Sequence, residues 1–159
     1  MSIDLHELAT FLVEAKRRTY AGLDDDATLA TPALANAKQL EHRAGAYLYR
    51  DIYFGIGFFV GQETVTSNDR VIWSMSYGGG IRADIADRET VVAVYAFLRM
   101  ALLKVETDHP YRGPAAFASG GLSYSNVVGG DLARFHGVET IERHGRDVYQ
   151  LHYAGGLLR

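Results

Sequence analysis

One segment of the sequence occurs twice, since residues 59–81 match residues 135–157 without a gap at an offset of 76 positions. Eight of the 22 positions from 59 to 80 carry the same residue in both copies. Random pairing at ordinary composition gives about one or two. The shared residues are Phe59, Gly61, Glu63, Thr64, Arg70, Tyr77, Gly79 and Gly80, which match Phe135, Gly137, Glu139, Thr140, Arg146, Tyr153, Gly155 and Gly156. Apolar and polar residues alternate in both copies, so we interpret each as a β-hairpin in a duplicated domain.

Two segments have the apolar spacing of helices, and each precedes one copy of the hairpin. Residues 4–18 repeat apolar side chains at intervals of three and four behind Asp4, a residue suited to the N-cap of a helix. Residues 87–104 form a similar stripe behind Asp87. Residues 22–38 show neither period, which predicts a loop. This loop is either a solvated connector or a flap over a site.

These elements predict an α+β fold in one domain that spans residues 1–159. The domain consists of two pseudo-symmetric halves, about 1–82 and 83–159, each a helix-strand-strand-strand unit. We expect a mostly antiparallel sheet with the two helices packed on one face. A chain of 159 residues is long enough to bury a substantial core around such a sheet.

The turn of each hairpin decides which residues of its two strands are opposite. A three-residue loop with a left-handed residue at its end would place Glu63 opposite Trp73, and Glu139 opposite Tyr149. Side chains alternate along a strand, so both glutamates are predicted on the apolar face that carries the aromatic residues. This face should point toward the core.

The two core-facing glutamates are the most informative candidates for chemistry. A buried carboxylate is costly unless it is hydrogen-bonded, paired with a cation or hydrated. In a structural interpretation each glutamate anchors a partner such as Arg70, Arg146, Arg112 or a tyrosine hydroxyl. In a functional interpretation Glu63 and Glu139 line a cleft between the two copies, where they bind a ligand or act as general acid and base.

The composition excludes several classes of site and partner. There is no cysteine, which removes disulfides, thiolate catalysis and cysteine-ligated metal centres and fits a cytoplasmic protein. The net charge is −3 and the basic residues are scattered, so we expect no direct nucleic-acid contact. No apolar run is long enough to span a membrane, and the first residues lack the pattern of a signal peptide. The histidine spacing predicts no metal site, and no motif indicates a cofactor.

Several motifs of the chain together resemble an uncharacterised bacterial domain family. They are Tyr49-Arg50-Asp51-x-Tyr53-x-Gly55, Phe59-x-Gly61-Gln62-Glu63-x-Val65, Ile72-Trp73-x-Met75-x-Tyr77-x-Gly79, Tyr111-Arg112-Gly113-Pro114 and Tyr149-x-Leu151-x-Tyr153-x-Gly155-Gly156. Members of this family stand alone or follow a helix-turn-helix of transcriptional-regulator type. The resemblance brings no activity or catalytic residue with it, and the helix-turn-helix is absent here. It implies an effector-sensing module.

We therefore predict a non-enzymatic domain that binds a small-molecule effector in a cleft between the repeats. One alternative is a small enzyme that uses Glu63 or Glu139 as general acid or base, and another is a homodimeric interaction module. The predicted ligand-binding residues share a position on the inner strand face or beside it, and they are Glu63, Glu139, Trp73, Tyr77, Tyr149, Tyr153 and Arg112.

Overall fold

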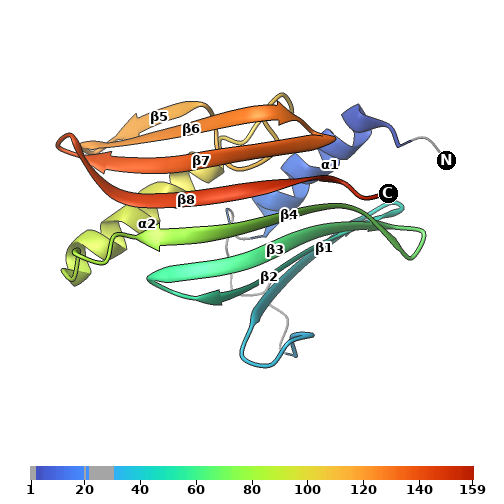
Figure 1. Cartoon of the computed structure of the whole chain (residues 1–159), viewed down its shortest axis with the longest axis horizontal. Helices are drawn as coiled ribbons and strands as arrows, with labels where there is room; N and C mark the ends of the chain where they lie inside the picture. The colour runs from blue at the N-terminus through green and yellow to red at the C-terminus, as the bar shows by residue number, and fades with distance from the viewer. Residues whose placement is uncertain (1–2, 20, 22–30) are drawn as a thin grey trace.

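A computed structural model describes residues 3–19, 21 and 31–159 of the chain (Figure 1). The described residues form two helices and eight strands. The helices are α1 (Leu5–Arg18) and α2 (Arg88–Leu102). The strands are β1 (Lys38–Ala44), β2 (Tyr47–Gly55), β3 (Phe58–Ser67), β4 (Arg70–Ile81), β5 (Ala116–Ser119), β6 (Leu122–Asp131), β7 (Arg134–Arg143) and β8 (Arg146–Leu157). The fold is therefore α+β, as the sequence predicted.

All eight strands belong to one antiparallel sheet with the order β1-β2-β3-β4-β8-β7-β6-β5. The first half of the chain, α1 with β1–β4, meets the second half, α2 with β5–β8, where β4 pairs with β8. The predicted three strands per half was wrong, because each half contributes four. The additional strands β1 and β5 are the two edges of the sheet, and edge strands carry a weaker pattern. Strand β1 is rich in charged residues, and β5 has only four residues.

Both predicted helices are present and begin at their predicted caps. Asp4 accepts hydrogen bonds from the backbone amides of His6 and Glu7 at 2.9 and 3.1 Å. Asp87 accepts one from the amide of Thr90 at 2.8 Å. These bonds satisfy amides that have no partner inside the helix. Neither of the two described helices is long and apolar enough to cross a membrane.

The hairpins turn through two residues, so the predicted three-residue loop was wrong. Asn68 and Asp69 both have positive φ, 49° and 59°, which is typical of a two-residue hairpin turn. A register irregularity between Val65 and Thr66 adds one further residue of shift. Glu63 is therefore opposite Met75 instead of Trp73. The second hairpin has the same shift, and Glu139 is opposite Leu151 instead of Tyr149. A shift of two residues preserves the face of every side chain, and both glutamates do point inward.

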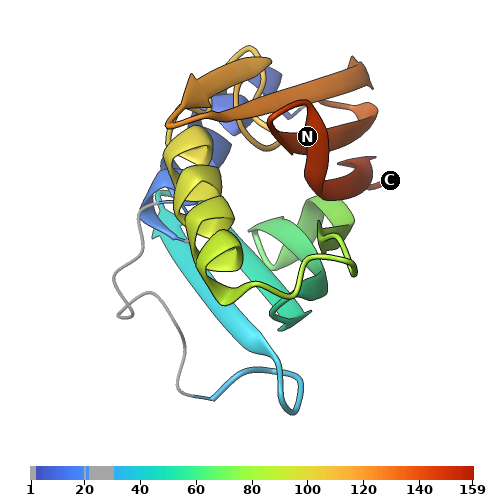
Figure 2. The same ribbon diagram turned by 90° about the vertical axis from the view of Figure 1, so that its left-hand side faces the viewer.

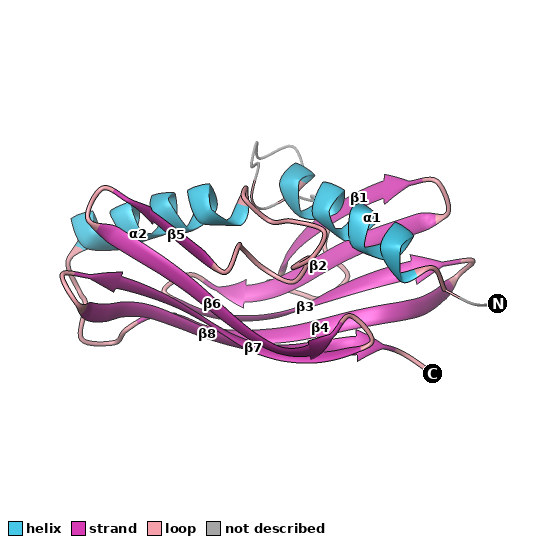
Figure 3. Cartoon of the chain, turned by 90° about the horizontal axis from the view of Figure 1, so that it is seen from above, coloured by secondary structure: helices cyan, strands magenta, loops and turns pink. Residues whose placement is uncertain are grey.

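Figure 3 shows α1 and α2 on the same side of the curved sheet, and Figure 2 shows the same arrangement along the sheet. The main apolar cluster combines residues of both helices with residues of the inner strands. Leu12 of α1 and Leu98 of α2 belong to this cluster, as does Met75 of β4. Of the predicted loop 22–38, residues 22–30 lie outside the described part. Residues 31–37 contain no helix or strand, and Lys38 begins β1.

Glycines allow the two central strands to approach closely where the halves meet. A side chain at Gly79 of β4 would overlap the carbonyl oxygen of Gln150 in β8. A side chain at Gly155 of β8 would overlap the carbonyl oxygen of Ser74 in β4. The junction between the halves therefore consists of backbone packed against backbone, and no larger residue fits at these positions.

Candidate functional site

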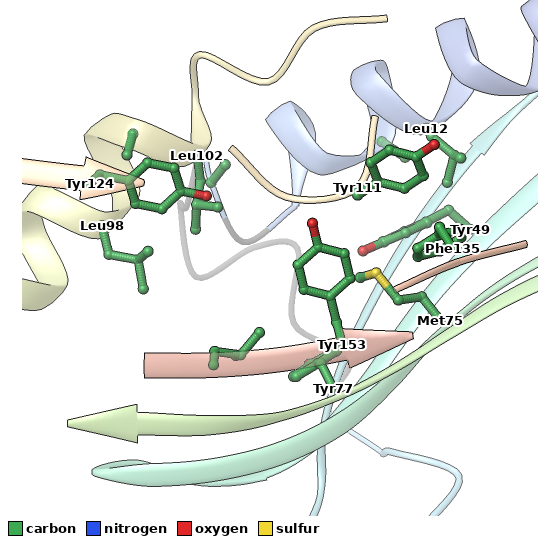
Figure 4. Close-up of a cluster of buried hydrophobic side chains, with 14 of the residues drawn as sticks. Leu12, Tyr49, Met75, Tyr77, Leu98, Leu102, Tyr111, Tyr124, Phe135 and Tyr153 are labelled. Atoms are coloured by element: carbon green, nitrogen blue, oxygen red, sulfur yellow. The ribbon is translucent and has the colours of Figure 1, made fainter. Parts of the chain in front are cut away.

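Five charged side chains lie in the interior between the sheet and the helices. They are Lys16 of α1, Asp51 of β2, Glu63 of β3, Arg112 of the loop after α2, and Glu139 of β7, and none is more than 3% exposed. Figure 4 shows the tyrosine and leucine side chains that pack in this interior. Charged groups are so rarely buried that each of these five must be balanced by a neighbour.

Glu139 is held by four hydrogen-bond donors. Arg112 donates from Nε to one carboxylate oxygen and from Nη2 to the other, both at 3.1 Å. The hydroxyls of Tyr124 and Tyr149 also donate to it, at 2.9 and 2.7 Å. Burial raises the pKa of the Tyr124 hydroxyl, and the Glu139 charge raises it further, so Tyr124 remains a donor at neutral pH. The carboxylate is fully paired and reaches no solvent.

Glu63 is balanced by a lysine that the sequence analysis did not identify. Lys16 donates from Nζ to one oxygen of Glu63, and both side chains are buried. Burial lowers the pKa of the Lys16 amine, and the Glu63 charge opposes this effect. Lys16 follows Leu12 by four residues and therefore lies on the apolar stripe of α1. This spacing was the available signal, since a lysine on the buried face of a helix needs a carboxylate.

Asp51 differs from the two glutamates because, within residues 3–19, 21 and 31–159, it forms no ion pair with a basic side chain. It accepts a hydrogen bond from the hydroxyl of Tyr77 at 2.7 Å, and no other hydrogen bond to it comes from the described residues. Burial raises the pKa of Asp51 to about 7, and the Glu63 charge adds to this. The Tyr77 hydrogen bond and the charges of Lys16 and Arg112 act in the opposite direction. The carboxyl therefore changes its protonation state near neutral pH.

The second half contains the same arrangement with an amide in place of the carboxyl. Tyr153 donates to Asn126 Oδ1 at 2.7 Å, which is also the distance from Tyr77 to Asp51. The side-chain nitrogen of Asn126 donates in turn to the carbonyl of Gly113 at 3.1 Å. An ionised carboxylate cannot make this second bond. Asp51 is therefore the charged member of an otherwise matched pair.

A glycine opposite each tyrosine makes room for its ring. Gly61 is directly opposite Tyr77, and Gly137 is directly opposite Tyr153. A side chain at either glycine would overlap the tyrosine ring and its hydroxyl. The tyrosine thus lies across the glycine and reaches a residue of the next strand. This contact explains why the repeated Phe-x-Gly-x-Glu motif accompanies a repeated tyrosine.

A pocket of about 210 Å³ opens beside Asp51, between α2 and the strands of the first half. Its apolar and aromatic walls include Phe59, Tyr95, Leu98 and Leu102. Figure 4 shows the side chains of Leu98 and Leu102, which both belong to α2. The polar members of the lining are Lys38, Asp51, Tyr53, Tyr77, Arg99 and Arg112, and the remaining members are Gly55 and Ile56.

The hydroxyl of Tyr95 in α2 is hydrogen-bonded to the turn between β2 and β3, beside the pocket. It donates to the carbonyl of Ile56 at 2.6 Å, and the carbonyl of Gly57 lies 3.1 Å from the same hydroxyl. The link joins the helical wall of the pocket to the turn between β2 and β3. The carbonyl of Gly57 also accepts a hydrogen bond from the backbone amide of Ile81 in β4, at 2.9 Å.

Two of the seven predicted ligand-binding residues line this pocket, namely Tyr77 and Arg112. The other five belong to the buried interior and are not part of the pocket lining. These are Glu63, Glu139, Trp73, Tyr149 and Tyr153, each at most 4% exposed. Asp51, Lys38 and Arg99 were not among the ligand-binding residues predicted from the sequence. For Asp51 a signal existed, because Tyr49-x-Asp51 resembles Tyr124-x-Asn126 at the same place in the other half.

Within the described residues, no three histidine, aspartate or glutamate side chains come together in a way that could hold a metal ion. Asp51 and Glu63 influence each other electrostatically, but Glu63 is occupied by Lys16. The described lining of the pocket therefore offers one carboxyl, three basic groups and several aromatic rings.

Residues 51–158 match the model of a family described as a domain of unknown function, DUF5680. The match begins at Asp51 and covers more than half of the chain, including the strands β3–β8 and the helix α2. No curated protein and no solved structure matches the chain.

Proposed function

The chain belongs to the DUF5680 family, and we propose that it is a non-enzymatic domain that binds a small-molecule effector in the pocket between α2 and the first-half strands. The observation that carries this proposal is the carboxyl of Asp51. It is 2% exposed, lines the pocket and forms no ion pair with a residue in the part of the chain that the structure describes. Pockets that bind small molecules are typically apolar with a few polar groups that fix the ligand's orientation, and this lining has that composition.

The position of the pocket differs from the cleft that the sequence suggested. We propose that ligand binding involves Tyr77 and Arg112 directly, because both line the pocket. Glu63 and Glu139 are buried behind the pocket lining and would influence the ligand through their neighbours. Arg112 donates to Glu139 and its guanidinium lies 5.5 Å from the centre of the Tyr77 ring, so Glu139 holds in place an arginine that the ligand would meet.

Catalysis by Glu63 or Glu139 has less support than binding. Both carboxylates are 0% exposed, and neither lines the pocket. A general acid or base must come within hydrogen-bond reach of the proton that it transfers. Glu139 already accepts four hydrogen bonds, which leaves little capacity for a substrate.

We also propose that the two halves arose by internal duplication, with the helices packed on a shared face of the sheet. The order of elements is the same in each half. The matched bonds from Tyr77 to Asp51 and from Tyr153 to Asn126 further support this origin. Replacement of an asparagine by an aspartate would then have produced a site in only one half.

The binding proposal is tested by recording NMR spectra of the full chain with and without a mixture of ring-containing fragments. We expect shifts of the Leu98 and Leu102 methyl signals, because both side chains line the pocket. The variant Leu98→Phe should reduce the shift of the remaining Leu102 methyl signals by filling the space. Val92→Phe is the matched control, because Val92 lies on the same helix and is 61% exposed. Equal shifts in both variants would contradict binding in this pocket.

A homodimeric interaction module has one observation in its favour. A second depression includes the exposed apolar residues Leu34, Phe54, Val60 and Val71. Apolar patches of this kind often mark contact surfaces. Sedimentation of the wild type and of Val60→Lys at increasing concentration tests this function. A dimer lost in the variant would support it, and a monomer throughout would exclude it.

A further inference from the structure

We infer that the ligand is a single-ring carboxylate that carries a hydroxyl group opposite its carboxylate. This inference rests on the proposed small-molecule binding and specifies the ligand's class. The pocket size, the exposed basic residues of its lining and the buried carboxyl of Asp51 together point to this class.

The pocket volume limits the ligand to about one ring. An apolar cavity of about 150 Å³ accepts benzene, whereas sites for drug-sized ligands span about 300–1,000 Å³. The pocket here has about 210 Å³. Phe59, Tyr95, Leu98 and Leu102 provide apolar surface on its walls, which suits a ring rather than a fully polar molecule.

The charges of the lining favour an anion. Among the described lining residues, Lys38, Arg99 and Arg112 contribute three positive charges, and Asp51 contributes one negative charge. Arg112 is engaged with Glu139, but the exposed Lys38 and Arg99 form no ion pair with any residue in the described part of the chain. A carboxylate is the anion that an arginine binds with paired hydrogen bonds. A ligand with only a positive charge would be repelled by this lining.

The inner end of the pocket requires a hydrogen-bond donor. Lys16 and Arg112 are paired with Glu63 and Glu139, so among the described side chains Tyr77 is the one that donates a hydrogen bond to the Asp51 carboxylate. The corresponding Asn126 makes a second bond, through its amide, to Gly113. A hydroxyl from the ligand would supply Asp51 with its missing second bond. A neutral hydroxyl does this without adding a positive charge to the pocket.

Tyr53 lines the pocket and lies near both acidic and basic members of the lining. Burial raises the pKa of its hydroxyl, the Asp51 charge raises it further, and the Arg99 charge lowers it. The charges of both Asp51 and Arg99 therefore act on the Tyr53 hydroxyl. The Lys38 amine also lies 6.0 Å from the centre of the Tyr53 ring. A ligand beside this ring would reach the acidic end with one substituent and the basic end with the other.

The test is isothermal titration calorimetry of the full chain at pH 8, where the Asp51 carboxyl is mostly ionised. The probes are 4-hydroxybenzoate, benzoate, phenol and tyramine. We expect 4-hydroxybenzoate to bind at least about tenfold more tightly than benzoate or phenol, because each of the latter loses one charge-assisted hydrogen bond. Tyramine, which carries a hydroxyl and a positive charge, should bind most weakly.

Two variants test which residue binds the hydroxyl of the ligand and which binds its carboxylate. Asp51→Asn should reduce the affinity for 4-hydroxybenzoate to that for benzoate, and the Tyr153–Asn126 pair shows that an asparagine fits beneath such a tyrosine. Arg99→Gln should reduce it to that for phenol. Arg43→Gln is the control, because Arg43 is exposed on β1 outside the pocket and should leave the affinity unchanged.

The outcomes separate this inference from the proposed function. Preference for tyramine, or equal binding of benzoate and 4-hydroxybenzoate, would overturn the ligand class while leaving a binding pocket in place. If none of the four probes binds but the fragment mixture still shifts the Leu98 and Leu102 signals, the ligand class is wrong and the binding pocket stands. If the fragments also cause no shift, both the ligand class and the binding function are wrong.

Discussion

The Tyr77 hydroxyl lies 2.7 Å from Asp51 Oδ1 and donates a hydrogen bond to it in the interior of the protein. This single bond connects β4 to β2 across β3, because Tyr77 extends over Gly61. It is also the hydrogen bond that favours the ionised form of Asp51. The stability of the fold and the charge of the pocket therefore depend on the same pair of residues.

Asp51→Asn should flatten the dependence of stability on pH between about 4 and 7. The folded-state pKa of Asp51 is raised from 3.8 to about 7, so in this range the folded state keeps a proton that the unfolded state has released. The contribution to the free energy of unfolding is greatest below the unfolded pKa and falls by about 1.4 kcal/mol per unit as pH rises. It levels off above the folded pKa. Urea unfolding at several pH values measures the slope.

Asp108→Asn provides the control for this measurement, because Asp108 is exposed outside the buried network. We expect the control to retain the slope of the wild type. An Asp51→Asn variant with the wild-type slope would show that Asp51 does not hold a proton in the folded state at pH 5 to 6.

Tyr77→Phe should destabilise the protein more than Tyr153→Phe at pH 8. Both changes remove one hydroxyl that donates at 2.7 Å, but Tyr77 loses a charged acceptor and Tyr153 a neutral amide. A hydrogen bond to a charged group contributes about 1.5–3 kcal/mol, and a neutral one about 0.5–1.5 kcal/mol. The difference should disappear near pH 5, where Asp51 is protonated. Denaturant unfolding of both variants at the two pH values checks this, and equal losses at pH 8 would refute it.

Glu139→Gln should cost more stability than Glu63→Gln, and the gap should widen as pH rises. Each change leaves a buried cation without its carboxylate, a loss of about 3–5 kcal/mol when the cation stays charged. Arg112 cannot release its proton, whereas Lys16 can, and burial already lowers the pKa of its amine. Thermal unfolding between pH 6 and 9 measures both losses. A loss for Glu63→Gln that does not decline with pH would contradict this account of Lys16.

Gly61→Ala should destabilise the fold by about 1–3 kcal/mol, since an added methyl group overlaps the ring of Tyr77 and must displace it. The displacement would also separate the Tyr77 hydroxyl from Asp51. Gly57→Ala is the matched control, because a methyl group at Gly57 meets no atom within 4 Å. We expect the control to change stability by less than about 0.5 kcal/mol. Comparable effects of the two substitutions in chemical unfolding would show that Gly61 does not make room for the ring.

The sequence was sufficient for the elements that carry strong local patterns. Asp4 and Asp87 predicted the start of both helices, because capping side chains act within one turn. The alternation in the repeated hairpins predicted that Glu63 and Glu139 point inward, and both are buried. This prediction was right although the predicted turn length was wrong. The shorter loop and the register irregularity together shift the pairing by two residues, which keeps each side chain on the same face.

The pairing partners and the pocket depended on contacts that local patterns do not encode. Arg112 was among the partners considered for the glutamates, and it pairs with Glu139. Lys16 was not, because it is separated from Glu63 by 47 residues and belongs to a different element. Asp51 is placed beside α2 only by the order of the strands, and that order follows from β4 and β8 meeting at the centre of the sheet. Single-sequence periodicity contains no information on such long-range placement.

The backbone junction between β4 and β8 also restricts how this protein can move. Rotation of one half against the other would break hydrogen bonds along a pairing that runs from Trp73 to Ile81. The pocket is lined by strands of this sheet and by α2, so a ligand too wide for it would have to displace α2. Such a displacement would break the contacts of the Tyr95 hydroxyl with the carbonyls of Ile56 and Gly57.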